Sequence, residues 1–496
     1  MTRKEKLYLN IISSLIQQII VIICGFILPR AILDYYGSTV NGLVSSITQF
    51  LGFISFLQMG IGAVVQSAWY KPLAENDNQK ISEIYISAEN FFRKIAKYFL
   101  FYVLILCVLY PIKVKSDFSY TFVIILIIVL SISLFIQYYF GITNQLLLYA
   151  DQKAYVYLLT QSILILLNTG ISLLLIKLEV SIHIVKFGAS LIFAINPIIL
   201  ELYIRKTLKI NKKLKLIYEP INQKLNGFVQ HMSSVIMENT DVAILTIFST
   251  LKNVSIYYIY YLVVYGVRQV ITSLTIGIQA MLGNMLISET KEYINFKFSN
   301  IELYFHIMVT FCFSAVLTLL TPFVLVYTKG ITDANYNVPI FSMCLTMAFA
   351  TYCYRLPYYT LVKAAGHFKE TQNSAIIEVL INIIVSICCV IKFGLIGVAI
   401  GTLIANIYRT IYFILYLKNN IINRPAKIFI KLITLDIVIF LLSYIISMKL
   451  EMRSNTFSSW MVYAVQVSLI CGVVTLIIMI IGNTFFYKQI LNKIRR

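Results

Sequence analysis

The stretch "SAIIEVLINIIVSICCVIKFGLIGVAIGTLIANIYRTIYFILYL" (374–417) holds two apolar runs separated by Lys392 and Phe393. Each run has about 20 residues, enough for a helix to cross the roughly 30 Å hydrocarbon layer of a membrane. The rest of the chain has the same character. Of its 496 residues, 59% are hydrophobic and 12% are charged, and the mean hydropathy is +0.83. Because soluble proteins are about half apolar and a quarter charged, the sequence predicts an all-α polytopic membrane protein.

Apolar runs of this length recur along the chain and predict about fourteen transmembrane helices. The expected spans are residues 7–33, 40–66, 95–112, 120–147, 154–177, 183–204, 226–250, 254–288, 301–327, 338–362, 371–391, 394–417, 428–448 and 457–485. The loops and span ends on one side hold roughly three times as many lysines and arginines as those on the other side, and such an excess marks the cytoplasm. Both termini are therefore expected in the cytoplasm.

Two stretches six spans apart resemble each other. "LLNTGIS" (166–172) and "LINIIVS" (380–386) share a leucine, an asparagine and a serine at equal spacing. Repeated bundles leave weak similarity of this kind. We expect a six-helix lobe over 1–210, a second six-helix lobe over 211–420, and two additional transmembrane helices with a cytoplasmic tail over 421–496. Chance similarity between leucine-rich segments is the alternative.

Several function classes have little support. The formal net charge of +20 is spread over loops instead of gathered on one domain, which argues against a nucleic-acid partner. The eight cysteines lack the spacing of a zinc or redox site, and the four histidines are scattered. No phosphate-binding lysine loop occurs. The sequence therefore predicts no metal, no cofactor and no enzyme activity. The predicted connections on the outer side are too short for a membrane polysaccharide polymerase, which is the weakest alternative.

Charged side chains inside the predicted spans are the candidate functional residues. Each costs about 2.5–3.5 kcal/mol near the bilayer centre if it faces lipid, so we expect them to face a water-filled cavity or one another. They are the four arginines Arg30, Arg268, Arg355 and Arg409 and the three carboxylates Glu238, Asp241 and Glu378. Arginine matches phosphate oxygens with paired hydrogen bonds, so its excess predicts an anionic cargo. Structural pairing with an acid or snorkelling to the surface is the alternative for Arg30 and Arg409.

Several stretches carry a family resemblance. They are "GFILPRAIL" (25–33), "GIG" (60–62), "WYKPLAENDNQKISEIY" (69–85), "ENTDVAIL" (238–245) and "KAAGHFKETQNSAIIEVLINIIVSICCVIKFGLIGVAIGTLIANIYRTIYFILYLKNN" (363–420). Over essentially its whole length the chain resembles the Wzx-type flippases of the MOP exporter superfamily, which move O-antigen, capsule or exopolysaccharide repeat units. The resemblance implies a MATE-like, V-shaped fold in a bacterial plasma membrane. It also implies transfer of an undecaprenyl-pyrophosphate-linked oligosaccharide from the inner to the outer leaflet by alternating access, coupled to an ion gradient.

The same resemblance implies roles for the charged residues. The four arginines become candidate ligands of the lipid headgroup, and Glu238, Asp241 and Glu378 become candidate ion-coupling groups. Tyrosines beside the arginines, namely Tyr261, Tyr354 and Tyr358, are candidate sugar contacts. Expected partners are the lipid-linked oligosaccharide, membrane lipids and other polysaccharide assembly proteins. A multidrug or cation antiporter and a peptidoglycan-precursor flippase of the same superfamily are the alternatives.

The glycines of "GLIGVAIGT" (394–402) have a structural interpretation. Gly394, Gly397 and Gly401 lie at a spacing typical of close helix packing. We expect them to bring two helices together and not to contact a ligand.

Overall fold

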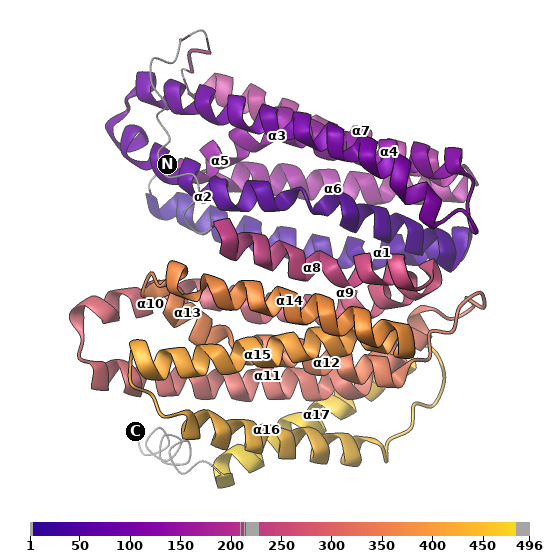
Figure 1. Cartoon of the computed structure of the whole chain (residues 1–496), viewed down its shortest axis with the longest axis vertical. Helices are drawn as coiled ribbons and strands as arrows, with labels where there is room; N and C mark the ends of the chain where they lie inside the picture. Colours follow the sequence, from indigo (N-terminus) through magenta and orange to yellow (C-terminus); the bar gives the residue numbers. More distant parts are fainter. Residues whose placement is uncertain (1–2, 209, 213, 215–227, 483–496) are drawn as a thin grey trace. The chain divides into compact units, whose positions relative to one another are not determined.

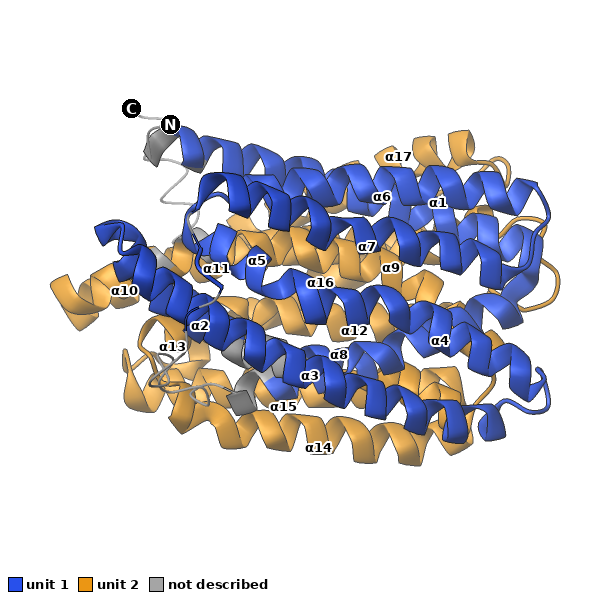
Figure 2. Cartoon of the chain, turned by 90° about the horizontal axis from the view of Figure 1, so that it is seen from above, with its two compact units in different colours: residues 1–239 blue, residues 240–496 orange. Residues whose placement is uncertain are grey.

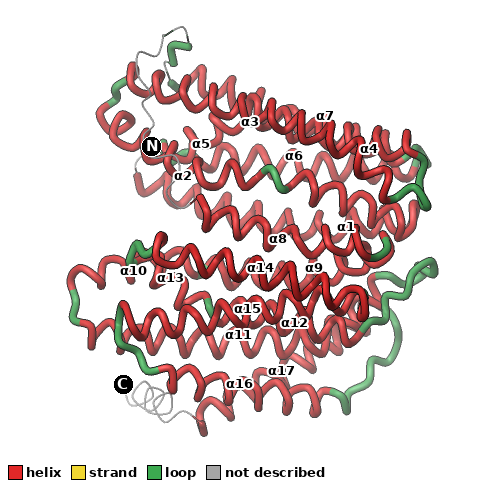
Figure 3. The backbone as a smooth tube through the Cα atoms, viewed as in Figure 1, coloured by secondary structure: helices red, strands yellow, loops and turns green. Residues whose placement is uncertain are grey.

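The computed structural model describes residues 3–208, 210–212, 214 and 228–482, and in this part of the chain all regular structure is helical (Figure 3). Eleven helices among the described residues are long and apolar enough to cross a membrane. An all-helical polytopic membrane fold, as the composition predicts, is therefore observed. The chain divides into two compact units, 1–239 and 240–496, each described by itself below (Figure 2).

Unit 1 is a bundle of long helices and shorter connecting helices (Figure 1). Helix α6 packs between α1 and α7, and α4 packs between α7 and α3. A π-helical segment follows α4, and the partition between the units falls inside the continuous helix α8. The elements are α1 (Arg3–Gly52), α2 (Ser55–Glu75), α3 (Asn78–Lys113), α4 (Tyr120–Ile136), the π segment (Gln137–Gly141), α5 (Ile142–Ala150), α6 (Ala154–Lys177), α7 (Ile182–Thr207) and the first part of α8 (Phe228–Phe248).

Helix α1 turns back on itself at Gly37, which has φ 79° and ψ 177°. Before this residue α1 runs alongside α6 in the same direction, and the hydroxyl of Tyr36 donates to the carbonyl of Val180, just beyond the end of α6. After it, Ser46 accepts from Tyr110 near the end of α3 (2.7 Å), and later residues of α1 meet earlier residues of α3. This region of φ and ψ is open essentially to glycine alone. The reversal lies between the predicted spans 7–33 and 40–66.

Among its described residues, unit 2 contains the second part of α8 and nine further helices. They are α9 (Leu251–Ser273), α10 (Thr275–Ser288), α11 (Lys291–Tyr327), α12 (Pro339–Tyr354), α13 (Leu356–Ala364), α14 (Phe368–Phe393), α15 (Leu395–Asn420), α16 (Ala426–Ser447) and α17 (Phe457–Gly482). Helix α15 packs between α14 and α12, and α11 packs against α12, α16 and α17. Within unit 2, the last two helices, α16 and α17, thus pack against α11.

Two predicted spans are each formed by two helices. The expected span 254–288 consists of α9 and α10, which meet at Leu274. The expected span 338–362 consists of α12 and α13, which meet at Arg355. Pro357 lies in the first turn of α13, where its missing N–H is not needed, and it cannot continue α12. The break places an arginine at a helix junction inside the unit.

The close packing predicted for the glycines of α15 is confirmed. A Cβ atom on Gly397 would lie 2.3 Å from the backbone carbon of Cys389 in α14. A Cβ atom on Gly401 would lie 2.0 Å from the hydroxyl oxygen of Ser386. Gly394, at the turn between the two helices, has φ 53°. Gly397 and Gly401 therefore let the backbones of α14 and α15 approach each other, whereas a Cβ atom on Gly394 would meet no atom within 4 Å.

Candidate functional site

A buried carboxylate in unit 2 lies between two arginines from different elements. Glu378 of α14 pairs through Oε1 with Arg355 at the α12–α13 junction. Its Oε2 lies 3.7 Å from Nε of Arg409 in α15. Arg409 also donates to the carbonyl of Thr371 (3.3 Å) and to the hydroxyl of Ser374. The side chains of Arg355, Arg409 and Glu378 are 11%, 3% and 7% exposed, so one anion is shared by two largely desolvated cations.

A third arginine joins this group through an aromatic ring. The guanidinium carbons of Arg268 and Arg355 lie 4.5 and 4.4 Å from the ring centre of Tyr352. Cations at this distance are attracted by the negative face of the ring. We call Arg268, Arg355, Arg409 and Glu378 the arginine cluster. With three guanidinium groups and one carboxylate, it carries a formal charge of +2.

The carboxylate of Asp241 lies in a different environment, among neutral donors. Asp241 is on α8 and is 3% exposed. It accepts hydrogen bonds from the hydroxyls of Tyr257 (2.9 Å) and Thr402 (2.7 Å) and from the amide of Asn382 (3.4 Å). Hydroxyls and amides can also satisfy a protonated carboxyl group. A change of protonation here would therefore need rotation of hydroxyl groups and no rearrangement of an ion pair.

A ladder of tyrosines on α9 connects the two environments. Tyr257, which donates to Asp241, stacks on Tyr261, and Tyr261 stacks on Tyr265. The ring centres are 5.7 and 5.1 Å apart. The ring of Tyr265 then lies 5.0 Å from the guanidinium carbon of Arg268. The residues recur at intervals of four, which places them on one helix face.

The fold can now be compared with known structures. No protein-family model and no curated protein sequence matches the chain. Among solved structures, the lipid II flippase MurJ in an inward closed conformation is similar to this chain, with a TM-score of 0.70 and 17% identity. The aligned region comprises 98% of this chain and 100% of the MurJ chain. The chain has the fold of the MOP-superfamily transporters. An inward-facing multidrug resistance MATE transporter of that superfamily covers 81% of this chain (TM-score 0.63, 13% identity), and the eukaryotic MATE transporter AtDTX14 covers 84% (TM-score 0.54, 12% identity).

Within this transporter fold, the predicted residues separate between the two units. Arg268, Arg355, Arg409 and Glu378 lie together in unit 2, and Asp241 is joined to them through the tyrosine ladder. Arg30 and Glu238 belong to unit 1. Arg30 forms an ion pair with Asp34, one turn later in α1 (2.8 Å), and Glu238 is half-buried on α8. Glu238 and Asp241 lie three residues apart on α8 and are assigned to different units, because the partition falls after Asn239.

Two of the three predicted sugar contacts are packed inside the core of unit 2. Tyr354 is 3% exposed, its hydroxyl bonds to that of Thr310 (2.7 Å), and its ring stacks on His306. Tyr358 is 1% exposed and donates to Glu302. Tyr261 is only half-buried. Tyr352, between the arginines, is the aromatic side chain that sequence reasoning missed, although it lies in the same tyrosine-rich stretch.

Two intramembrane carboxylates were also missed from the sequence. Glu302 and Asp436 fall inside the predicted spans 301–327 and 428–448, so an acidic residue in an apolar run was the available signal. Both are fully buried. Asp436 of α16 lies 2.5 Å from Nδ1 of His306 and 2.5 Å from the hydroxyl of Thr310, both in α11. Glu302 pairs with Arg424. These contacts tie α16 and the segment before it to α11.

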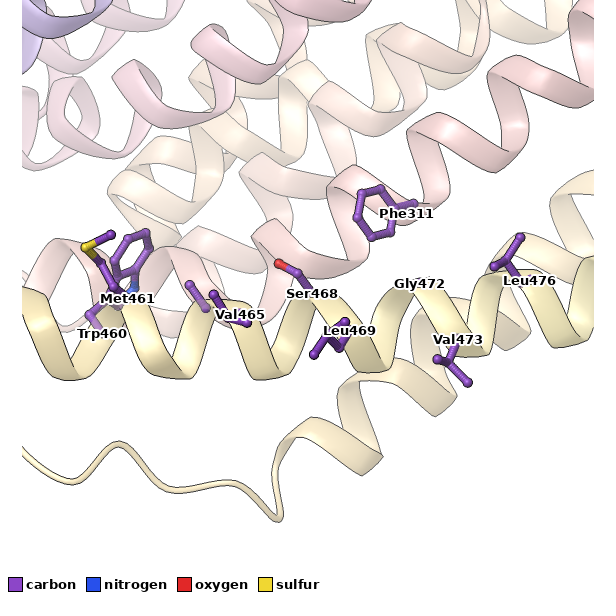
Figure 4. Close-up of a pocket in the computed structure, with 10 residues that line it drawn as sticks. Phe311, Trp460, Met461, Val465, Ser468, Leu469, Gly472, Val473 and Leu476 are labelled. Atoms are coloured by element: carbon purple, nitrogen blue, oxygen red, sulfur yellow. The ribbon is translucent and has the colours of Figure 1, made fainter.

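An apolar cavity of about 620 Å³ lies between α11 and α17 (Figure 4). Apart from the hydroxyl of Ser468 and the indole of Trp460, its lining is hydrocarbon: Phe311, Met461, Ala464, Val465, Leu469, Gly472, Val473 and Leu476. It suits membrane hydrocarbon and not a sugar. Among the described residues, no three or more His, Cys, Asp or Glu side chains are grouped as metal ligands would be.

Proposed function

We propose that this protein is a flippase that moves an undecaprenyl-pyrophosphate-linked oligosaccharide repeat unit from the inner to the outer leaflet of the plasma membrane. The observation that carries the proposal is the buried arginine cluster in a fold that matches the lipid II flippase MurJ over nearly the whole chain. A diphosphate linked to a lipid is the anion that such a fold and such a cluster would bind together.

The proposed architecture has about fourteen transmembrane helices: a six-helix lobe over 1–210, a six-helix lobe over 211–420, and two helices over 421–496. Eleven described helices qualify as spans by length and composition. Helix α8, helix α12 and the predicted span 40–66 would supply the other three. The MATE structure covers 81% of this chain and the MurJ structure 98%. The greater coverage by MurJ supports the additional pair of helices. The charge asymmetry of the loops supports cytoplasmic termini.

In this proposal the arginines of the cluster bind the diphosphate, and Glu378 is the counter-ion that the substrate displaces. Arg355 and Arg409 already form ion pairs with one carboxylate, and a phosphate group presents more acceptor oxygens and more charge to the guanidinium groups. Arg268 supplies the third cation. Arg30 is likewise proposed as a headgroup ligand.

Ion coupling is proposed to use carboxylates that can change protonation inside the protein. Asp241 is the foremost, because its partners are neutral hydroxyls and an amide. Glu378 and Glu238 are the other two. For the sugar, we propose stacking on Tyr352 and Tyr261. Tyr354 and Tyr358 use their hydroxyls in the core, so we leave them out of the sugar site.

Two other functions of this superfamily compete with the proposal. A cation or multidrug antiporter would need a site that attracts cations, whereas the arginine cluster carries a formal charge of +2. A peptidoglycan-precursor flippase would share the lipid diphosphate and differ only in the sugar. Polysaccharide assembly proteins are proposed partners of a repeat-unit flippase and not of a peptidoglycan-precursor flippase.

Depletion of the protein in its native host tests the proposal. Lipids are extracted, and lipid-linked saccharides are identified by mass spectrometry. We expect a complete undecaprenyl-linked repeat unit to accumulate, inaccessible to reagents added outside the cell. Accumulation of lipid II would instead assign the precursor-flippase function. Unchanged lipid-linked sugars with increased sensitivity to cationic drugs would refute the flippase proposal.

Two variants test the residue roles in the same host. Arg268→Ala is expected to lose transport through weaker headgroup binding, and Asp241→Asn through loss of ion coupling. Variants that are made at normal levels and restore full transport would remove those residues from the mechanism.

A further inference from the structure

A second group of basic residues in unit 2, which shares no residue with the arginine cluster, lines a cavity between α11 and α16. The cavity has a volume of about 410 Å³. That volume lies within the usual range for small-molecule sites. Its lining combines five polar residues with four apolar ones, and we call it the α11–α16 pocket. It is formed by Phe296, Ser299, Glu302, Leu303, Arg424, Lys427, Ile428, Lys431 and Leu432.

The buried arginine of the pocket is incompletely satisfied. Only 4% of the Arg424 side chain is exposed. One terminal nitrogen donates to Asn295 (3.0 Å) and Ser299 (2.7 Å), and the other pairs with Glu302. In the described part of the chain its Nε has no hydrogen-bond acceptor. A buried donor without an acceptor costs about 1–3 kcal/mol, so the guanidinium group of this lining residue is left with an unused donor.

Two lysines place further positive charge at the same cavity. Lys427 and Lys431 lie one turn apart in the first turns of α16 and therefore share one helix face. Both are exposed, and within the described residues neither has a carboxylate within 4 Å. The N-terminal end of α16 adds the positive end of a helix dipole. Three cations thus surround a space large enough for a phosphate group.

The carboxylate in the pocket does not cancel this charge. Glu302 accepts from Arg424 through one oxygen and from the hydroxyl of Tyr358 through the other. Both oxygens are therefore directed to partners in the protein. The residues of the pocket keep a formal charge of +2.

The remaining walls of the pocket are apolar. Phe296, Leu303, Ile428 and Leu432 line it beside the polar residues, and Leu303 and Leu432 belong to the hydrophobic cluster that continues between α11 and α16. A soluble phosphate has no apolar part that could pack against these walls, whereas a phospholipid carries a phosphate and hydrocarbon together. Polybasic groups at a membrane surface attract anionic lipid headgroups in this way.

We propose that the α11–α16 pocket binds the headgroup of an anionic phospholipid, with the phosphodiester held by Arg424, Lys427 and Lys431. By the charge asymmetry of the loops this lipid belongs to the cytoplasmic leaflet. The site is separate from the arginine cluster and does not depend on the proposed cargo. Bound lipid would brace the start of α16, which packs against α11.

Binding of short-chain phosphatidylglycerol to the purified full-length protein in a neutral detergent tests the site. Microscale thermophoresis gives the Kd. Each lysine near a headgroup contributes about fivefold, so the double variant Lys427→Gln/Lys431→Gln should bind roughly 30-fold more weakly. Lys418→Gln, an exposed lysine at the end of α15, is the matched control and should bind like the wild type. Both lysines of the double variant are exposed, so folding is expected to be preserved.

Three further measurements test whether the headgroup charge, the lipid tails and Arg424 each contribute to binding. Phosphatidylcholine with the same tails should bind at least tenfold more weakly, and glycerol phosphate without tails should bind weakly as well. Arg424→Gln should weaken phosphatidylglycerol binding in protein that still elutes as a single species. The proposal is wrong if the double lysine variant binds like the wild type, if phosphatidylcholine binds as tightly, or if glycerol phosphate equals the lipid.

Discussion

Replacing Glu378 by glutamine should strongly destabilise unit 2. The change keeps the size of the side chain but removes the single carboxylate shared by Arg355 and Arg409. The formal charge of the arginine cluster rises from +2 to +3. The side chains of Arg355, Arg409 and Glu378 are all 11% exposed or less. Removing one partner of a buried ion pair costs about 3–5 kcal/mol, because the remaining charge is left uncompensated. At about 2–4 °C per kcal/mol for a unit of this size, the melting temperature should fall by roughly 6–20 °C.

The fluorescence of Trp69 and Trp460 during heating in detergent measures this effect. Glu75→Gln is the matched control, since it makes the same substitution in an exposed pair with Lys71 at 3.8 Å. Exposed pairs contribute about 0–1 kcal/mol, so its melting temperature should change by about 4 °C or less. The reasoning fails if Glu378→Gln melts within 2 °C of the wild type. An added diphosphate that restores the melting temperature of Glu378→Gln would support the proposed displacement of this carboxylate by substrate.

Three further substitutions test how the helices are arranged. Gly397→Ala should destabilise the protein by about 1–3 kcal/mol, because the new methyl group overlaps the backbone of α14, whereas Gly170→Ala, which meets no atom within 4 Å, should be neutral in the same thermal melt. Gly37→Ala should cost of order 1–3 kcal/mol by straining the reversal of α1, and an unchanged melting temperature would show that the turn tolerates a side chain. Asp436→Asn should cost about 1–3 kcal/mol by leaving a buried donor of α11 without its acceptor, which thermal melts in detergent would detect and a wild-type value would contradict.

The candidate site was partly predictable because charge inside an apolar run is visible in one dimension. Each such residue needs a partner or water, so the sequence could identify Arg268, Arg355, Arg409 and Glu378 as candidates. It could not pair them. The contacts depend on which faces of α9, α12, α14 and α15 meet, and on the break at Pro357 that turns Arg355 into the unit.

What the sequence by itself determined is the membrane-spanning, all-helical character of the protein and the approximate position of its helices. That information resides in composition and run length, because a chain in lipid must satisfy its backbone locally. The sequence already placed a turn between the spans 7–33 and 40–66, and the tertiary structure decided that Gly37 forms it with a positive φ. It also decided that Tyr354 and Tyr358 belong to the core while Tyr352 lies between two arginines. These outcomes arise from packing between helices distant in sequence. Hydropathy does not indicate which faces of two helices are in contact.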